Sequence, residues 1–285
     1  MDEPSTGTLR VPGAALHYET RGEGPLLLML PGGSGVGEPF DGMAERLAAH
    51  FTVAVLEPRG APRSPLDDPD AEQSVEEHAD DALRLIDLLS PDAPASVFGS
   101  SSGAITALAL TAHRPDRVRR TVAHEPPVVE VLPDADRHRR MFDEVHRAFR
   151  SGGVEAAIAV MAEGFDAPAE APARPPGPEA MARMHAGMPF FLDRIVPRFT
   201  RFVPDTEALR ASGRLVPAHG AATRGRLPAR PAERLGDLVA HPSTELPGGH
   251  LGYTAHPEEF AEALLRLLLE DGRCPVGTDG ITDLP

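Results

Sequence analysis

The stretch Phe98-Gly99-Ser100-Ser101-Ser102-Gly103-Ala104 decides the fold, because it joins a short apolar strand to a helix through a turn of small residues. Residues 95–98 are predicted as the strand and residues 104–110 as the helix. Gly-x-Ser-x-Gly in this context is typical of a nucleophile elbow, a sharp turn that exposes a strained serine. The glycines set the register, so Ser101 is the candidate nucleophile. The backbone N–H of Ser102, which opens the helix, is a candidate donor to a developing oxyanion.

A second glycine-rich turn, Pro31-Gly32-Gly33-Ser34-Gly35, follows the apolar run 26–30. A strand that is apolar on both faces belongs in the middle of a parallel sheet. A glycine turn at its carboxyl end lets the backbone approach a ligand, so the N–H of Gly33 is the second candidate oxyanion donor and Ser34 a candidate substrate contact. The spacing does not fit the Gly-x-Gly-x-x-Gly of a dinucleotide-binding loop.

Composition excludes several classes of function. Across 285 residues, 28 basic and 43 acidic side chains give a net charge of −15. This balance disfavours nucleic-acid and anionic-membrane partners. The chain contains no lysine, which excludes a Walker A lysine and a pyridoxal-phosphate Schiff base. We expect no cofactor. We also expect no metal site, because no pair of histidines has the His-Glu-x-x-His spacing of a zinc site.

The two ends of the chain carry little chemistry. The first residues have neither a basic nor an apolar segment of the kind that directs export, so a cytoplasmic protein is expected. One cysteine, Cys274, rules out an internal disulfide, and we expect it to be a passive thiol. Residues 271–285 are predicted to be a loose tail.

Strand and helix patterns alternate along most of the chain. Helices are predicted at 74–89, where Ser74 and Glu77 form a capping box, and at 228–239 and 257–269. The sequence therefore predicts an α/β fold with a mostly parallel, eight-stranded sheet and helices on both faces. The remaining strands are expected at residues 8–11, 15–19, 51–56, 119–125, 214–218 and 242–246.

The pattern changes over residues 126–204, which read as helices interrupted by a Pro/Ala-rich connector at 167–178. The helices are expected at 137–150, 154–164, 179–186 and 190–202. This predicts a helical cap, residues 126–204, inserted into a core domain of residues 1–125 and 205–285. Methionine and phenylalanine concentrate in the cap, either as ordinary core or as the wall of an apolar substrate pocket. The candidate substrate contacts there are Met161, Met188, Phe190, Phe191 and Phe199.

A serine hydroxyl needs a base, and the base needs an orienting acid. His250 lies in a Gly-Gly-His turn after the last strand and fits the base, whereas His256 precedes Pro257 and reads as a helix-start residue. The loop 219–225, the usual place for the acid, contains no carboxylate. Glu125 is the substitute, because neighbouring parallel strands end at one sheet edge. Asp237 is the alternative, but a mid-helix position points it away.

At these residues the chain resembles the α/β-hydrolase superfamily over nearly its whole length, and more narrowly the zearalenone lactonases. The resemblance implies a Ser-His-Glu triad of Ser101, His250 and Glu125, with Gly33 and Ser102 as the oxyanion hole. Beside the elbow, it rests on Pro115-Asp116-Arg117, His124-Glu125, Gly220-Ala221-Ala222-Thr223, Leu246-Pro247-Gly248-Gly249-His250, His256-Pro257 and Phe260-Ala261-Glu262.

The sequence departs from the lactonases at one point, since these resemble one another in a cap tryptophan and this chain has none. Either Phe190, Phe191 or Phe199 takes the aromatic role, or the substrate is another lactone or ester. We expect the partner to be a small apolar ester or lactone, and a homodimer is left open. The alternatives are C–C bond or thioester hydrolysis by the same triad and, in another class, a non-catalytic small-molecule receptor. A haloalkane dehalogenase or an epoxide hydrolase would be expected to have an aspartate at the elbow, so Ser101 argues against both activities.

Overall fold

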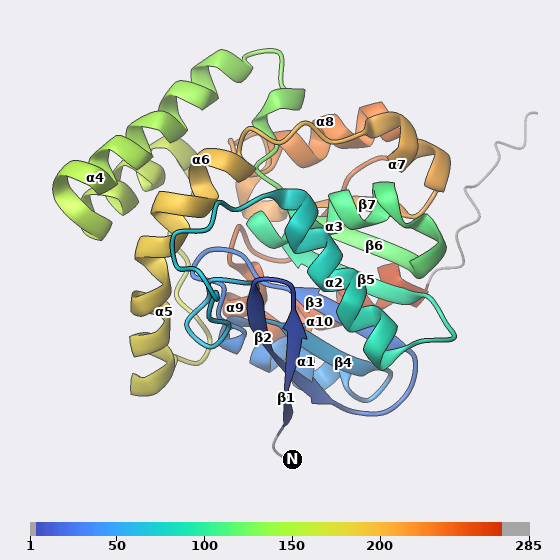
Figure 1. Ribbon diagram of the computed structural model, residues 1–285. Helices are drawn as coiled ribbons and strands as arrows, with labels where there is room; N and C mark the ends of the chain where they lie inside the picture. The colour runs from blue at the N-terminus through green and yellow to red at the C-terminus, as the bar shows by residue number, and fades with distance from the viewer. Residues whose placement is uncertain (1–3, 270–285) are drawn as a thin grey trace, which may run out of the picture.

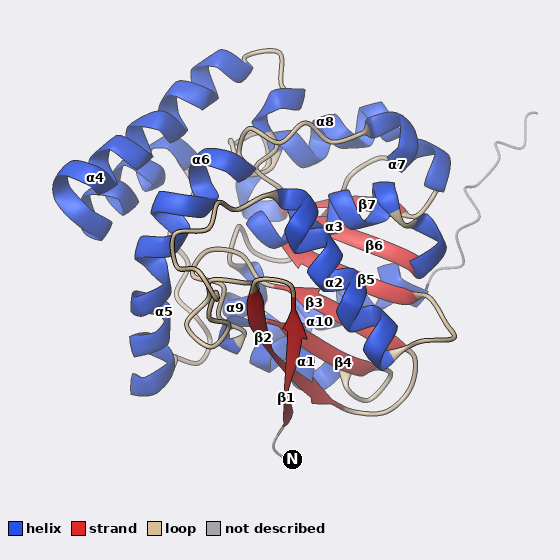
Figure 2. Cartoon of the chain, viewed as in Figure 1, coloured by secondary structure: helices blue, strands red, loops and turns tan. Residues whose placement is uncertain are grey.

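A sheet of eight strands forms the centre of the computed structural model, which describes residues 4–269 (Figure 1, Figure 2). The strand order is β1-β2-β4-β3-β5-β6-β7-β8; β1 and β2 pair antiparallel at one edge and the other strands run parallel. This confirms the predicted α/β fold. The strands are β1 (Ser5–Val11), β2 (Ala14–Arg21), β3 (Leu26–Leu30), β4 (Thr52–Leu56), β5 (Ala95–Ser100), β6 (Val118–His124), β7 (Leu215–Gly220) and β8 (Thr244–Leu246).

Helices cover both faces of the sheet, and β3 shows why its sequence is continuously apolar. Leu28 packs into the core on one face, whereas Leu27 and Met29 pack into the core on the other. Successive side chains of a strand point to opposite faces, so a strand covered on both sides has no polar position. One face carries α2 (Val75–Leu89), α3 (Ser102–His113), α7 (Thr206–Ser212) and α8 (Arg230–Val239); the other carries α1 (Asp41–Leu47), α9 (Gly252–Ala255) and α10 (Pro257–Leu269).

Residues 126–204, here called the helical segment, lie between β6 and β7 and form helices outside the sheet (Figure 1). Their side chains, with Leu227, make up a third hydrophobic cluster. Two separately predicted helices form one helical stretch, α4, but Gly153 kinks it with φ +78°, close to the predicted break. The helix predicted at 190–202 is instead a π-helical turn followed by a short helix with a proline in its first turn. The segment contains η3 (Val129–Val131), α4 (Ala135–Phe165), α5 (Pro178–Phe190), η4 (Phe191–Ile195) and α6 (Val196–Phe199).

Smaller elements depart from the sequence prediction. Helices α1 and α7 were not predicted, and neither were the 3₁₀ turns η1 (Glu38–Phe40), η2 (Pro115–Arg117) and η5 (Ala221–Thr223). At the start of α2 the Ser74 hydroxyl accepts from the N–H of Glu77, but the Glu77 carboxylate binds Arg59, so half of the predicted capping box forms. The predicted tail and Cys274 lie outside the described residues. Between residues 4 and 269, every helix is too short or too polar to cross a bilayer.

Candidate active site

Ser101 lies between the end of β5 and the start of α3, with φ +54° and ψ −123°. This conformation is strained for a residue with a side chain. The flanking glycines make the turn feasible: a Cβ at Gly99 would lie 2.5 Å from the carbonyl oxygen of Gly103, and one at Gly103 would overlap that of Leu30. Among residues 4–269, the Ser101 hydroxyl makes no hydrogen bond to another side chain. The sequence motif and the strained turn therefore coincide at this serine.

Glu125 follows β6 with φ +48° and is almost completely buried. Its Oε2 accepts a hydrogen bond from Nδ1 of His250 at 2.7 Å, and its Oε1 accepts from the N–H of Gly220 and the hydroxyl of Thr223. Burial alone raises the pKa of this carboxyl, but the hydrogen bond and charge of His250 and the other polar contacts outweigh it and lower the pKa to about 2. An ionised carboxylate only accepts, so His250 carries its proton on Nδ1 and leaves Nε2 free as a base.

His250 is held in the loop after β8 by contacts from the helical segment. The ring of Phe165 packs edge-on against the imidazole at 5.5 Å between centroids. Glu170, in the connector 166–177 between α4 and α5, accepts a hydrogen bond from the N–H of Gly249 at 2.8 Å. The N–H of Ala173, in the same connector, donates to the carbonyl of Thr254. Residues distant in the sequence therefore fix the backbone on both sides of His250.

A buried polar cluster lies behind the imidazole of His250. The ring of His124 stacks on that of His250 at 6.4 Å and makes a 3.3 Å contact from Nδ1 to the Ser100 hydroxyl. Burial, together with the charge of His250, lowers the pKa of His124 to about 4 despite the opposing charge of Glu125. Burial also raises the pKa of Tyr253 to about 12. Both side chains are neutral near pH 7, so neither adds a charge next to the ion pair that Glu125 can form with His250.

The loop after β3 brings the predicted oxyanion donor close to the elbow. A Cβ at Gly32 would lie 2.6 Å from Cβ of Ser101, so the loop backbone passes directly beside the serine. Gly33 has φ +59°, a conformation that favours glycine. Gly33 and Ser102 both border the same cavity. Their position beside Ser101 suits donation to a negatively charged oxygen.

That cavity has about 550 Å³ of empty space, part of it open to solvent. Ser34, Phe190, Phe191 and Phe199, all predicted substrate contacts, line it. Met161 and Met188 do not; they pack against the hydrophobic cluster of the helical segment, where thioether side chains fill gaps in ordinary core. The cavity is thus aromatic on the side formed by α5, η4 and α6.

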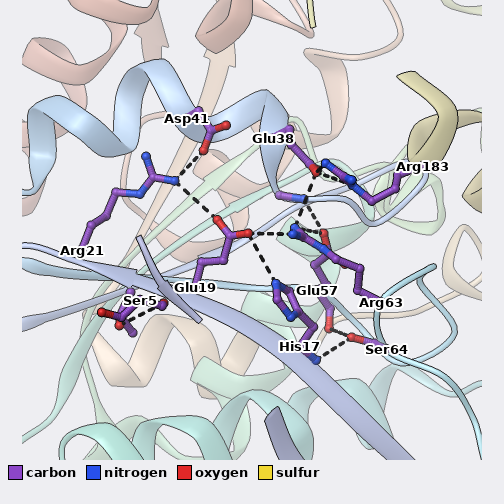
Figure 3. A network of polar contacts seen from close by, with 12 residues as sticks. Ser5, His17, Glu19, Arg21, Glu38, Asp41, Glu57, Arg63, Ser64 and Arg183 are labelled. Carbon is purple, nitrogen blue, oxygen red and sulfur yellow. Dashed lines mark hydrogen bonds and ion pairs between the residues drawn. The ribbon is translucent and has the colours of Figure 1, made fainter. Parts of the chain in front are cut away.

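A network of charged side chains anchors the loop that carries Gly33 (Figure 3). Buried Glu57 accepts from the N–H of Gly37 at 3.0 Å and from Arg63 at 2.7 Å. Arg183 of α5 donates to Glu38 at 2.6 Å, which ties the helical segment to the residue that follows this loop. Sequence patterns did not indicate this network, because its members come from separate stretches of chain.

Within residues 4–269, neither rejected candidate makes a side-chain contact with Ser101 or Glu125. Asp237 of α8 has a side chain that is 75% exposed and lies 3.7 Å from Arg234. His256 ends α9 directly before α10 and has its Nε2 3.9 Å from Glu170. Sequence reasoning missed Thr223, whose hydroxyl binds Glu125. The one signal for Thr223 in the sequence was that the loop 219–225 contains no carboxylate. In the structure this loop instead supplies hydrogen-bond donors to Glu125.

Comparisons with known proteins agree with this architecture. A family model described as the α/β hydrolase fold matches residues 25–156. The uncharacterized hydrolase YraK of Bacillus subtilis (strain 168) is 32% identical over 271 residues, covering 93% of this chain and 96% of that protein. Zearalenone hydrolase of Bionectria ochroleuca is 30% identical over 270 residues, covering 88% and 92%. The solved structure of Est816, an N-acyl homoserine lactone degrading enzyme, superimposes with a TM-score of 0.69 at 23% identity, covering 91% and 99%.

The fold and these relatives define an enzyme of the hydrolase class. Similarity to YraK extends over almost the full length of both chains, and the family model covers the elbow and the strands around it. The chain belongs to the α/β-hydrolase family, and within it resembles the zearalenone lactonases.

Proposed function

We propose that this hydrolase cleaves apolar carboxylic esters, foremost lactones, through a triad of Ser101, His250 and Glu125. The observation that carries the proposal is the 2.7 Å bond from His250 Nδ1 to a buried Glu125 carboxylate, at the sheet edge where Ser101 occupies a strained turn. The 30% identity with a zearalenone hydrolase supports a lactone as the substrate.

In the first half of the proposed reaction, the Ser101 oxygen attacks the ester carbonyl carbon while Nε2 of His250 accepts the hydroxyl proton. Glu125 holds the Nδ1 proton and stabilises the imidazolium that forms. The N–H groups of Gly33 and Ser102 donate to the carbonyl oxygen as it becomes negative. The C–O bond then breaks, and Nε2 returns the proton to the departing alkoxide.

In the second half, water replaces the alcohol. Nε2 of His250 accepts a proton from water, whose oxygen attacks the acyl carbon and releases Ser101 as the proton returns to its oxygen. In a lactone the leaving alkoxide is tethered to the acyl group, so one hydroxy acid is the only product.

The helical segment, residues 126–204, is proposed to act as a cap over a core of residues 1–125 and 205–285. Phe190, Phe191 and Phe199 border the cavity that also touches Gly33 and Ser102. In this chain, which has no tryptophan, these rings would pack against the apolar part of the substrate. Their position favours a substrate with an apolar or aromatic body.

Chromatography of zearalenone incubated with the wild type and with Ser101→Ala tests the proposal. We expect ring-opened acid from the wild type and at least about 10⁴-fold less from the variant, because the nucleophile is lost. If the wild type leaves zearalenone intact but cleaves aryl esters, the triad stands and the lactone assignment fails. If it cleaves neither, or if Ser101→Ala retains full activity, the proposal is wrong.

A further inference from the structure

His78 of α2 borders the cavity, although only 5% of the residue is exposed. Its ring packs edge-on against Phe199 at 4.9 Å between centroids. On its other side, Nε2 lies 3.1 Å from Oε1 of Gln73. A polar ring is thus built into the wall of an otherwise mainly apolar chamber, which calls for a functional explanation.

The contacts of Gln73 fix the tautomer of this histidine. The side-chain Nε2 of Gln73 donates to the carbonyl oxygen of Ala71 at 3.0 Å, so its Oε1 must face His78. An amide oxygen only accepts, which places the histidine proton on Nε2. Nδ1 of His78 is therefore an acceptor, and it has no hydrogen-bond partner within residues 4–269.

The surroundings of His78 also keep the ring uncharged. Burial, followed by the positive charge of Arg59, lowers its pKa to about 3. At neutral pH the ring therefore presents a lone pair rather than a second N–H donor. A ligand group that meets Nδ1 must bring a hydrogen of its own.

Three other polar side chains that border the cavity, Arg59, Asp81 and Thr106, already have partners. Both oxygens of Asp81 accept from Arg59, each at 2.7 Å. The remaining terminal nitrogen of Arg59 binds Glu77 at 2.5 Å. The hydroxyl of Thr106 donates to the carbonyl of Ser102. Of these side chains, only His78 presents a hydrogen-bonding atom, Nδ1, that has no partner within residues 4–269.

We propose that the cavity receives a substrate with a hydroxyl on its apolar body, and that this hydroxyl donates to Nδ1 of His78. The inference rests on the proposed ester or lactone hydrolysis and specifies its substrate class. An ether or ketone at the same place would bring a lone pair against Nδ1 and be disfavoured, whereas an alcohol or phenol would satisfy it. His78 is thus a specificity-determining residue that takes no part in the chemistry at the ester.

Matched esters test this role. The first series consists of p-nitrophenyl esters of phenylalkanoic acids of increasing chain length. The phenyl ring of each acid carries a hydroxyl, a methoxy group or only hydrogen. A second series of reversed esters carries the same rings on the alcohol side. For the wild type, we expect at one chain length a kcat/KM about tenfold higher for the hydroxyl ester than for the methoxy ester, the ratio that one good hydrogen bond supplies. His78→Phe should remove this preference, so that the hydroxyl and methoxy esters have kcat/KM values within about twofold of each other.

Gln73→Leu provides a second variant outside the cavity lining. Without the amide oxygen the ring can adopt either tautomer, so the hydroxyl-to-methoxy ratio should fall because the methoxy ester gains. A wild type that cleaves the unsubstituted ester without preferring hydroxyl at any chain length overturns the inference, as does a preference that survives His78→Phe. If His78→Phe does not fold, an unchanged ratio in Gln73→Leu overturns it. A wild type that cleaves none of the esters overturns the proposed function itself.

Discussion

Two residues of the candidate triad occupy backbone conformations that side chains rarely adopt. Within residues 4–269, four non-glycine residues have positive φ, and Ser101 and Glu125 are two of them. They follow neighbouring strands, since β5 pairs with β6. Strain of this kind, of order 1–3 kcal/mol per residue, persists where surrounding structure imposes it and is concentrated at functional sites. In this protein both strained residues lie at the carboxyl edge of the sheet.

Replacing Glu125 by Gln should lower kcat by roughly 10³- to 10⁴-fold, because the amide cannot hold His250 in the Nδ1-protonated form and cannot stabilise its positive charge. Steady-state kinetics on an aryl ester gives the comparison. Asp237→Asn is the matched control, since that carboxylate is 75% exposed on α8, and it should retain wild-type kcat. Loss of turnover in Asp237→Asn with retention in Glu125→Gln would place the acid on α8 instead.

Sequence patterns alone led to the two candidate residues Ser101 and Glu125, whose roles stay predictions. Ser101 follows from a strand, glycines and a helix, and Glu125 from the absence of a carboxylate in the loop 219–225. The contacts of Thr223 with Glu125 and of His78 with Gln73 and Phe199 were not predicted, because only packing brings these partners near. Met161 and Met188 show the converse: composition cannot distinguish a pocket wall from the core of a helix cluster.

At the scale of elements, α5 is joined to the loop that carries Gly33. Arg183 binds Glu38, and a Cβ at Gly187 would overlap the carbonyl oxygen of Ser34. Glu57 and Arg63 hold the same loop from the sheet side (Figure 3). The loop is thus fixed between the helical segment and β4.

Arg183→Leu should raise KM for an aryl ester several-fold with less effect on kcat, because α5 and its Phe190 lose an anchor beside the cavity while the triad contacts stay. Glu38→Gln should act in the same direction. In a double-mutant cycle on kcat/KM, we expect a coupling of about 1 kcal/mol for this partly buried pair. Strictly additive effects would show that the ion pair does not hold α5 in place.

Elements with a strong periodic pattern were predictable, and those whose form depends on neighbours were not. The apolar run of β3 and the amphipathic α2 gave their positions from sequence alone. Helices α1 and α7 are only seven residues long and are stabilised by packing, α1 against α10 and α7 against α3 and α8. The π-turn η4 packs against α4, a helix that no local pattern places beside it.

At the scale of the whole molecule, two imidazoles are buried in the neutral form. The pKa of His124 falls from 6.5 to about 4 and that of His78 to about 3. Above pH 6.5 these rings are neutral in the folded and in the unfolded protein, so their titration does not change the free energy of unfolding. Below it the unfolded chain binds protons that the folded protein does not, and stability decreases as pH falls.

His124→Phe should therefore lose less stability on acidification than the wild type. The measurement is urea unfolding of both proteins at several pH values. As pH falls from 6.5 to 4, the free energy of unfolding of the variant minus that of the wild type should rise by about 1.4 kcal/mol for each pH unit. Carboxylates that do not interact with His124 titrate equally in both proteins and cancel in the difference. His78→Phe should shift the difference in the same direction. A pH-independent difference would mean that these rings are not held neutral.

The connector 166–177 gives the proposed cap a second consequence. Glu170 and Ala173 bind the backbone on either side of His250, so any movement that carries the connector outward also releases the imidazole's loop from its supports. The proposed cap and the loop of the candidate base are therefore coupled through two hydrogen bonds. If the cap opens by moving the connector, His250 loses these backbone supports and regains them only when the connector returns.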